Sequence, residues 1–206
     1  MIKQKYGVVY TPGSLSNFVA ELLKRVSSNE DIKVILDPAS GECALLRAVQ
    51  NIFGNKKEYI GIDVDKEAIQ NTKDAFRIIH NDTIMPQKVK KKTVDYWRDK
   101  LPVVDAVIAN PPWSSEKIYE RADLISAGFS LVSGQYDSYV LFMEFAFNIL
   151  RENGLMAFII PDSLFDTQNE NLRKFLLEKT QIKVIARLGE KIFEEVNRAT
   201  TVPELQ

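Results

Sequence analysis

The sequence predicts an α/β protein built on a doubly wound, mostly parallel β-sheet, and three observations support this prediction. Short apolar runs, of the length of buried strands, alternate along the chain with segments of helical periodicity. These runs are apolar at nearly every position, which is typical of strands that helices cover on both faces. The conspicuous turn motifs all follow such runs, where open α/β sheets bind their ligands.

Strands and helices are expected in alternation along the chain. A short N-terminal helical segment comes first, with Thr11 as its cap and Pro12 at its first position, and it continues to Val26. Strands are expected over residues 32–36, 59–62, 77–79, 105–109, 155–160 and 182–188. Further helices are expected over residues 44–52, 66–76, 139–150 and 169–178.

A helix stop signal and two long loops are also expected, and the loops interrupt the alternation. Asn153-Gly154 is expected to end the helix over residues 139–150, because both residue types favour the conformation that closes a helix C-terminus. Residues 81–104 and 110–138 are expected to form long loops. Loops of that length in a compact domain are usually functional or mobile.

The composition is that of an ordinary globular protein, with 206 residues of which 45% are hydrophobic and 27% charged. Cys43 is the single cysteine and His80 the single histidine, so an internal disulfide is excluded and no bound metal is expected. No signal peptide is visible, and the longest apolar runs, such as residues 155–161, are too short to span a bilayer. We therefore expect a soluble, cytoplasmic protein without a membrane partner. Its net charge of −1 gives the whole chain no strong attraction to nucleic acid.

The sharpest motif is the tetrapeptide Asn110-Pro111-Pro112-Trp113, which directly follows an apolar run. The prolines stiffen the turn and hold two oxygens outward, the Asn110 amide oxygen and the Pro111 carbonyl. Two acceptors around one aryl NH2 group favour tetrahedral geometry at the nitrogen, which localises a lone pair that the ring otherwise delocalises. Trp113 would stack on that ring. We interpret all four residues as catalytic; the alternative is a rigid turn whose tryptophan fills the core.

A second motif, Asp37-Pro38-Ala39-Ser40-Gly41, lies between the first expected strand and its helix. Small residues let backbone amides approach a ligand closely at a helix N-terminus. The turn lacks the G-x-G-x-x-G pattern of dinucleotide binding, because Cys43 stands where a second glycine would be. Alone this motif is weak evidence, since many strand-to-helix turns contain Asp, Ser and Gly.

Acidic residues follow the next two expected strands. Asp63, about 20 residues after the glycine turn and next to Val64, could bind both hydroxyls of a ribose. Asp65 suits the N-cap of the next helix. Asp82, which Thr83 follows, could accept a hydrogen bond from the amine of an adenine ring. Each aspartate could also be an ordinary turn or helix-start residue.

In this order the motifs resemble those of the N6-adenine DNA methyltransferases of bacterial restriction–modification systems, and the resemblance covers nearly the whole chain. It implies the Rossmann-like fold of class I S-adenosylmethionine-dependent methyltransferases, with S-adenosylmethionine as the cofactor and DNA as the substrate. The cofactor-binding residues that it implies are Tyr10, Thr11 and Pro12 in a closing motif, Asp37 to Gly41 in a methionine-binding turn, Asp63 with Val64 at the ribose, Asp82 with Thr83 at the adenine, and Asn110. It also implies that Trp113 and Phe193 hold the target base, Phe193 lying within a matching stretch of residues 189–196.

The resemblance also implies a domain organisation. Residues 1–30 correspond to a segment that closes over the cofactor, and residues 31–206 to the catalytic domain, in which residues 137–139 and 157–161 match later motifs. The chain stops at Gln206, where the last strand should be completed and a target-recognition domain should begin. We expect either that the chain is cut short or that a separate specificity chain supplies recognition. Methylation of specific DNA sites by this chain alone is then expected to be weak or absent.

Two other functions remain open. Amine methyltransferases that act on protein glutamine or on RNA share the Asn-Pro-Pro-aromatic turn, although Tyr10-Thr11-Pro12 and the Asp-Pro-Ala turn favour adenine in DNA. A non-catalytic fragment or subunit that binds only a cofactor or a partner is the second alternative, and the intact tetrapeptide argues against it. The lysine-rich residues 88–92 are interpreted as a solvated loop rather than as a contact to the DNA backbone.

Overall fold

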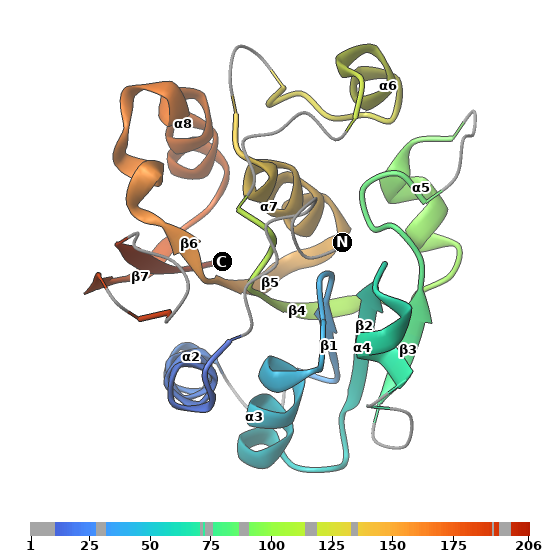
Figure 1. The fold of residues 1–206 in the computed structure, drawn as a ribbon, viewed down its shortest axis with the longest axis vertical. Helices are drawn as coiled ribbons and strands as arrows, with labels where there is room; N and C mark the ends of the chain where they lie inside the picture. The colour runs from blue at the N-terminus through green and yellow to red at the C-terminus, as the bar shows by residue number, and fades with distance from the viewer. Residues whose placement is uncertain are drawn as a thin grey trace.

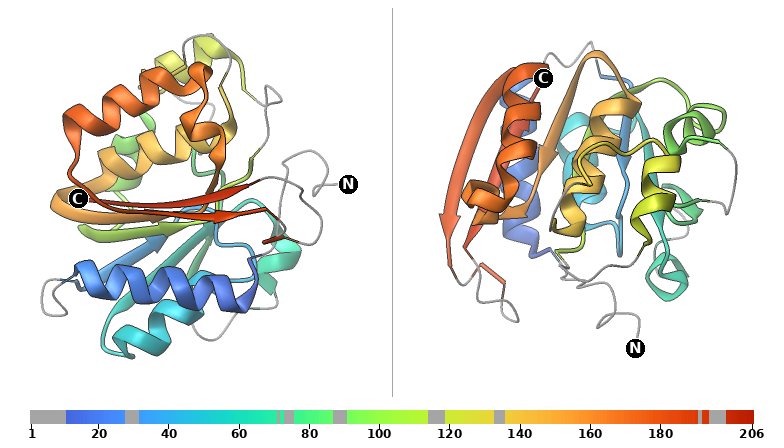
Figure 2. Two further views of the ribbon diagram at one scale, coloured as in Figure 1. Left: turned by 90° about the vertical axis from the view of Figure 1, so that its left-hand side faces the viewer. Right: turned by 90° about the horizontal axis from the view of Figure 1, so that it is seen from above.

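The chain folds around one mixed β-sheet that lies between two layers of helices (Figures 1 and 2). The structure is a computed structural model that describes residues 11–27, 32–70, 72, 76–86, 91–113, 119–132, 136–190, 192–193 and 199–206. The strands are β1 (Val34–Asp37), β2 (Glu58–Asp63), β3 (Arg77–His80), β4 (Val104–Ala109), β5 (Leu150–Phe158), β6 (Ile160–Pro161), β7 (Ile182–Gly189) and β8 (Thr200–Leu205). The helices are α2 (Gly13–Val26), α3 (Ala44–Phe53), α4 (Lys66–Gln70), α5 (Thr93–Arg98), α6 (Arg121–Ser126), α7 (Ser138–Ile149) and α8 (Glu170–Lys179), with 3-10 turns at Asp162–Phe165 and Thr167–Asn169.

The helices cover both faces of the sheet, as the apolar strands predict. Helices α2 and α3 pack together on one face, while α5, α7 and α8 lie on the other (Figure 2). All residues of β1 and β4 are buried, because these central strands are covered from both sides. None of the described helices is both long and apolar enough to cross a membrane.

The sheet is doubly wound, and its strand order creates a switch point between β1 and β4. The order is β3-β2-β1-β4-β5-β8-β6, and β7 pairs with β8. Leu36 of β1 lies opposite Ile60 of β2 on one side and Val107 of β4 on the other, both in parallel. The chain therefore builds the sheet outward from β1 through β2 to β3. It then returns to the middle of the sheet and builds outward from β4 in the opposite direction. In such sheets the ligand crevice lies at the carboxyl ends of the two strands at the switch point, here β1 and β4.

The expectation that Thr11 caps the first helix is wrong. Helix α2 begins at Gly13 with Pro12 as its N-cap residue, and no side chain caps it. The Thr11 hydroxyl instead accepts a hydrogen bond from the side chain of Asn110. Threonine is favoured as a helix cap, but here its hydroxyl makes a long-range contact, and local sequence preferences do not predict such contacts.

The expectation that Asn153-Gly154 ends a helix is also wrong. Helix α7 ends at Ile149, and the pair lies within β5, where Asn153 has a φ of 59°. At this point β5 makes a bulge against β4, because the partner of Val104 is Leu150 and the partner of Ala106 is Leu155. A residue in the left-handed conformation can occur in a β-bulge as well as at a helix end. The sequence therefore indicated the conformation of Asn153 correctly but not the element in which it lies.

The helix expected over residues 66–76 is shorter in the described part of the chain. Helix α4 is Lys66–Gln70, and neither Thr72 nor Phe76 is helical. The amide of Thr72 donates to the carbonyl of Ile69, three residues back, at 3.1 Å. This tighter bond and the Thr72 hydroxyl, which donates to the same carbonyl at 2.9 Å, turn the chain toward β3.

Two helices were not expected from the sequence, and one strand was expected only as an incomplete last strand near Gln206. Helices α5 and α6 lie within the two long segments interpreted as loops. Strand β8 lies antiparallel between β5 and β7, and all six of its residues are buried. The sequence of β8, Thr-Thr-Val-Pro-Glu-Leu, does not indicate a strand, because Pro203 and Glu204 are unusual in an interior strand.

Glu204 is the least expected residue of β8. Its side chain is fully buried, and neither carboxylate oxygen has a hydrogen-bond partner among the described residues. Burial raises the pKa of this carboxyl from 4.5 to about 7, because the charged form loses its hydration. Burial therefore favours the protonated, uncharged form of the Glu204 side chain.

Candidate active site

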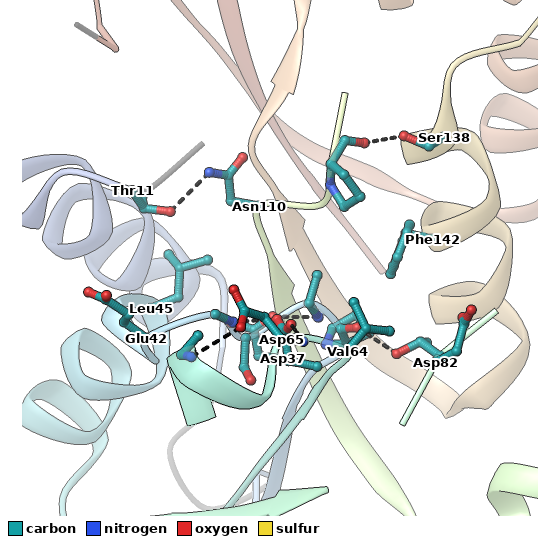
Figure 3. A pocket seen from close by; sticks show the side chains of 18 of the residues that line it. Thr11, Asp37, Glu42, Leu45, Val64, Asp65, Asp82, Asn110, Ser138 and Phe142 are labelled. Carbon is teal, nitrogen blue, oxygen red and sulfur yellow. Dashed lines mark hydrogen bonds between the residues drawn. The ribbon is translucent and has the colours of Figure 1, made fainter. Parts of the chain in front are cut away.

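A cavity opens at the switch point of the sheet (Figure 3). Its walls come from the ends of β1, β2, β3 and β4, from the start of α3 and from α7. Many of its lining residues belong to the motifs singled out in the sequence, namely Thr11, Asp37 to Gly41, Asp63 to Asp65, Asp82, Thr83, Asn110 and Pro112. The fold therefore brings together motifs that are up to about a hundred residues apart.

Carboxylates dominate the charge of this cavity. Asp37, Glu42, Asp63, Asp65 and Asp82 line it, and its described lining includes no lysine or arginine. Phosphate-binding sites rely on cations and free backbone amides. A ligand of this cavity is accordingly expected to carry positive charge rather than phosphate.

The turn after β1 is tied firmly to β2. The Gly41 amide donates to Asp63 Oδ2 at 2.6 Å, and the Ser40 amide donates to the Ile62 carbonyl at 3.1 Å. The two segments approach so closely that a Cβ on Gly61 would come within 2.7 Å of Ser40 Oγ. Ser40 Oγ is itself buried and has no hydrogen-bond partner among the described residues. It is a buried polar atom in the turn that lines the cavity.

Burial shifts the titration of both aspartates at the base of this turn. Asp37 is 1% exposed, and burial, reinforced by the nearby charge of Asp63, raises its pKa to about 8 even though the Ala39 amide donates to it at 3.1 Å. Burial also raises the pKa of Asp63, against the opposing effect of hydrogen bonds from the amides of Asp65 and Gly41. A positive ligand group would favour ionisation of both.

Of the residues after β2, Asp65 caps the next helix as predicted. Asp65 Oδ1 accepts hydrogen bonds from the amides of Glu67 and Ala68 at 2.9 and 3.3 Å, so Asp65 caps α4. Asp63 Oδ1 accepts from the Asp65 amide at 2.8 Å, which holds its carboxylate at the cavity. Val64 lies beside it, and its carbonyl is 3.1 Å from Nε2 of the exposed His80.

The two carboxylate oxygens of Asp82 accept hydrogen bonds from different partners. Its Oδ1 accepts from the amides of Ile84 and Met85 at 2.9 and 3.0 Å. Its Oδ2 accepts a 2.8 Å hydrogen bond from the phenol of Tyr119, which also lines the cavity. Thr83 next to Asp82 donates to the Pro38 carbonyl at 2.6 Å, which joins this turn to the one after β1. Sequence reasoning missed Tyr119, because a lone tyrosine in a long loop carries no local signal.

The tetrapeptide after β4 is held at both ends. The Asn110 amide nitrogen Nδ2 donates to Thr11 Oγ1 at 3.0 Å, and the Ser138 hydroxyl at the start of α7 donates to the Pro112 carbonyl (Figure 3). Asn110 and Pro112 line the cavity, whereas Pro111 and Trp113 are buried and do not line it. Phe142 on α7 faces the cavity as well, and sequence reasoning did not single it out.

Family comparison places the chain among known proteins. A family model described as N-6 DNA Methylase matches residues 2–205. The chain belongs to the N-6 DNA methylase family. This confirms the resemblance found in the sequence motifs.

Curated relatives of this N-6 DNA methylase family chain include two type II methyltransferases. It is 24% identical over 202 residues to M.AccI of Acinetobacter calcoaceticus, covering 94% of this chain and 35% of that protein. It is 23% identical to M.TthHB8I of Thermus thermophilus, covering 89% of this chain and 41% of that protein. The chain thus spans about a third to two fifths of these relatives.

Solved structures show the same fold. A class I S-adenosylmethionine-dependent methyltransferase from Listeria monocytogenes matches with a TM-score of 0.74 and 24% identity, over 98% of this chain and 63% of that one. The methyltransferase subunit of a type I restriction–modification system from Streptococcus thermophilus matches with a TM-score of 0.78 and 19% identity, over 96% and 44%. The fold of this N-6 DNA methylase family chain is therefore the class I methyltransferase fold, as expected.

The two aromatic residues assigned to the target base do lie together. Phe193 and Trp113 are 3% and 7% exposed, with ring centroids 5.1 Å apart and planes at 86°. Trp113 Nε1 donates to the Ile159 carbonyl at 3.3 Å, which anchors the indole. In this edge-to-face contact the rings touch each other, so a base would need them to part. Tyr10, the lysines at positions 88 and 90, and residues 194–196 lie outside the described residues.

Proposed function

We propose that this chain transfers a methyl group from S-adenosylmethionine to the N6 amine of adenine in DNA. The observation that carries the proposal is the carboxylate-lined cavity with Asn110 at its wall. Such a cavity suits the two positive charges of S-adenosylmethionine, its sulfonium and its ammonium group, and disfavours a phosphate-bearing nucleotide. Membership of the N-6 DNA methylase family supports the choice of adenine in DNA.

The residues of the cavity fit that cofactor. Asp63 would accept hydrogen bonds from the ribose hydroxyls. Asp82 Oδ2 would accept a hydrogen bond from the adenine amine. Asp37 and the unpartnered Ser40 hydroxyl would bind the methionine portion, next to the Ala39 and Gly41 backbone. When bound, S-adenosylmethionine supplies an electrophilic methyl group on its sulfonium.

Asn110 and Pro111 are assigned the activation of the target amine. The Asn110 amide oxygen and the Pro111 carbonyl would accept the two N–H bonds of the adenine N6 group. This draws the nitrogen toward tetrahedral geometry and directs its lone pair away from the ring, so no formal base is needed. Much of the rate would then come from holding two reactants in line.

Trp113 and Phe193 are assigned the capture of the target base. A base that leaves the duplex loses stacking and pairing worth a few kcal/mol, and aromatic side chains compensate part of that loss. Because Trp113 is anchored to Ile159, movement of Phe193 is the expected way to open a slot between the rings. The edge-to-face contact would keep both apolar rings out of water until a base arrives.

Recognition of a DNA sequence is assigned to a part outside these residues, either further protein or a separate specificity chain. The net charge of −1 supports this assignment, because phosphate contacts require lysine and arginine. The length of the relatives is consistent with it, since the chain spans only part of each.

The test is methyl incorporation from tritiated S-adenosylmethionine into DNA, RNA and protein, side by side, with the part that supplies recognition present. Adenine-unmethylated genomic DNA is the preferred substrate, because it contains every target sequence. We expect label in N6-methyladenine and a rate at least about a hundredfold lower for Asn110→Ala, by analogy with loss of one transition-state hydrogen bond. Label in RNA or in protein glutamine instead would replace the proposal with its alternatives. Unchanged activity of Asn110→Ala would refute the amine-activation mechanism.

A further inference from the structure

Thr11 and Asn110 are 99 residues apart in the sequence and meet at the wall of the cavity. Asn110 Nδ2 donates a 3.0 Å hydrogen bond to Thr11 Oγ1, and Figure 3 shows the amide nitrogen directed at Thr11 with the oxygen on the opposite side. Thr11 precedes α2, and Asn110 directly follows β4. The contact therefore joins the N-terminal segment to the tetrapeptide.

The orientation of an asparagine amide decides what it can do. One side of the amide is an acceptor and the other a donor, and half a turn about the last side-chain bond exchanges them. Only the oxygen can accept a hydrogen bond from a target amine. A fixed acceptor for Nδ2 favours the orientation in which the oxygen faces away from Thr11. Removing the Thr11 hydroxyl therefore weakens that preference.

The hydroxyl of Thr11 is well placed to act as a fixed acceptor. The first turn of α2 is held by the Ser16 amide and hydroxyl, which both donate to the Pro12 carbonyl at 2.9 and 3.2 Å. Leu15 in the same turn is buried in the core. Thr11 is thus attached to a rigid element rather than to a free end.

We propose that Thr11 is a positioning residue that acts through Asn110. Its hydroxyl fixes the amide so that the oxygen accepts the hydrogen bond of the reacting amine. The inference rests on the proposed function, because it takes from it the role of Asn110 as an acceptor. It gives Thr11, in the N-terminal segment, a role in the reaction that is distinct from cofactor binding.

The first test separates positioning from cofactor binding. Thr11→Val keeps the shape of the side chain and removes its hydrogen-bonding group, whereas Thr11→Ser keeps the hydroxyl. We expect the single-turnover rate at saturating S-adenosylmethionine to fall about threefold to tenfold in Thr11→Val and to recover in Thr11→Ser. The dissociation constant of S-adenosylmethionine, measured by calorimetry, should hardly change. Weaker cofactor binding with an unchanged saturated rate would overturn the inference.

The second test asks whether Thr11 acts through Asn110. In an Asn110→Ala background, Thr11→Val should cause no further loss of rate, because the group that it positions is gone. Losses that multiply would show an independent role and overturn the inference. Ser14→Ala, which alters an exposed hydroxyl in the same turn that does not line the cavity, is the matched control. It should retain the wild-type rate.

A third measurement does not depend on activity. The side-chain amide signals of Asn110 in a nitrogen–proton NMR spectrum are assigned by their disappearance in Asn110→Asp. They should shift in Thr11→Val and stay near their wild-type positions in Thr11→Ser. Unchanged signals in a folded Thr11→Val variant would overturn the inference. A wild type that transfers no methyl group even when the part that supplies recognition is present overturns the proposed function and this role with it, whereas an active wild type matched in rate by Thr11→Val overturns only the role of Thr11.

Discussion

The phenol of Tyr119 donates a 2.8 Å hydrogen bond to Oδ2 of Asp82, the carboxylate oxygen that the proposed function assigns to the cofactor's adenine amine. The other oxygen of Asp82 is already bonded to the Ile84 and Met85 amides. Tyr119 therefore competes with the ligand for this oxygen, which can accept at most two hydrogen bonds.

Tyr119→Phe is expected to strengthen S-adenosylmethionine binding. Removing the hydroxyl frees Asp82 Oδ2 while the aromatic ring keeps its place at the cavity. By the usual contribution of one hydrogen bond, the dissociation constant should fall about twofold to tenfold in calorimetry. Weaker binding in this variant would mean that the phenol orients Asp82 for the ligand rather than competing with it.

Asp63→Ala is expected to weaken S-adenosylmethionine binding by about 1–3 kcal/mol, through loss of the acceptor for the ribose hydroxyls. The substitution also removes the bond from the Gly41 amide, so Asp63→Asn, which keeps one acceptor oxygen, is the companion variant. Its loss should be smaller. Calorimetry that finds wild-type affinity for both variants would remove Asp63 from the site.

Cys43 offers a test of backbone strain. It is fully buried and adopts a φ of 61°, in the left-handed region that favours glycine. Cys43→Ala keeps this conformation and loses the packing of the sulfur, while Cys43→Gly loses one more methyl group but relieves the strain. At an ordinary helix position glycine is about 1 kcal/mol less stable than alanine. Here we expect Cys43→Gly to be at least as stable as Cys43→Ala in urea unfolding, and the ordinary order would contradict the strain argument.

Glu204 should make stability depend on pH. Its pKa is about 7 in the folded chain and near 4.5 when hydrated, so the folded state holds the proton more tightly. The stability that this linkage contributes is fully present below pH 4.5 and is lost as the pH rises through 7. Glu204→Gln cannot ionise, so its free energy of unfolding relative to the wild type should increase between pH 5 and pH 8, by on the order of 3 kcal/mol. Asp37 also has a raised pKa, but it is present in both proteins and cancels in the difference. A difference that does not vary with pH would contradict the burial of an unpartnered acid.

The parts of the fold that were predictable are those whose signals are local. Continuous apolar runs identified β1, β2, β4 and the core of β5, and Asp65 was recognised as a helix cap because its preference depends only on its neighbours. Strand β8 escaped detection because the surrounding sheet, rather than its own residues, makes it a strand. The same distinction explains Thr11, whose hydroxyl is directed by a residue far along the chain.

The candidate site divides in the same way. Motif order indicated which residues should meet at the ends of β1, β2 and β4, and most of them do line the cavity. Tyr119 and Phe142 could not be found from the sequence, because a single aromatic residue in a loop or an apolar helix looks like packing. Trp113 and Phe193 were predicted to hold a target base, which stays a prediction; the edge-to-face contact between their rings depends on the surrounding core and carries no local sequence signal.

The position of β8 has a consequence for how the chain assembles during synthesis. Residues 200–205 leave the ribosome after the other strands described above, yet they lie between β5 and β7 rather than at a margin. Until they arrive, both neighbouring strands present unpaired backbone to the surroundings, and such edges invite pairing with other chains. Insertion of β8 therefore has to follow the synthesis of both of its neighbours, and the nascent chain is exposed to aggregation at β5 and β7 until β8 is inserted.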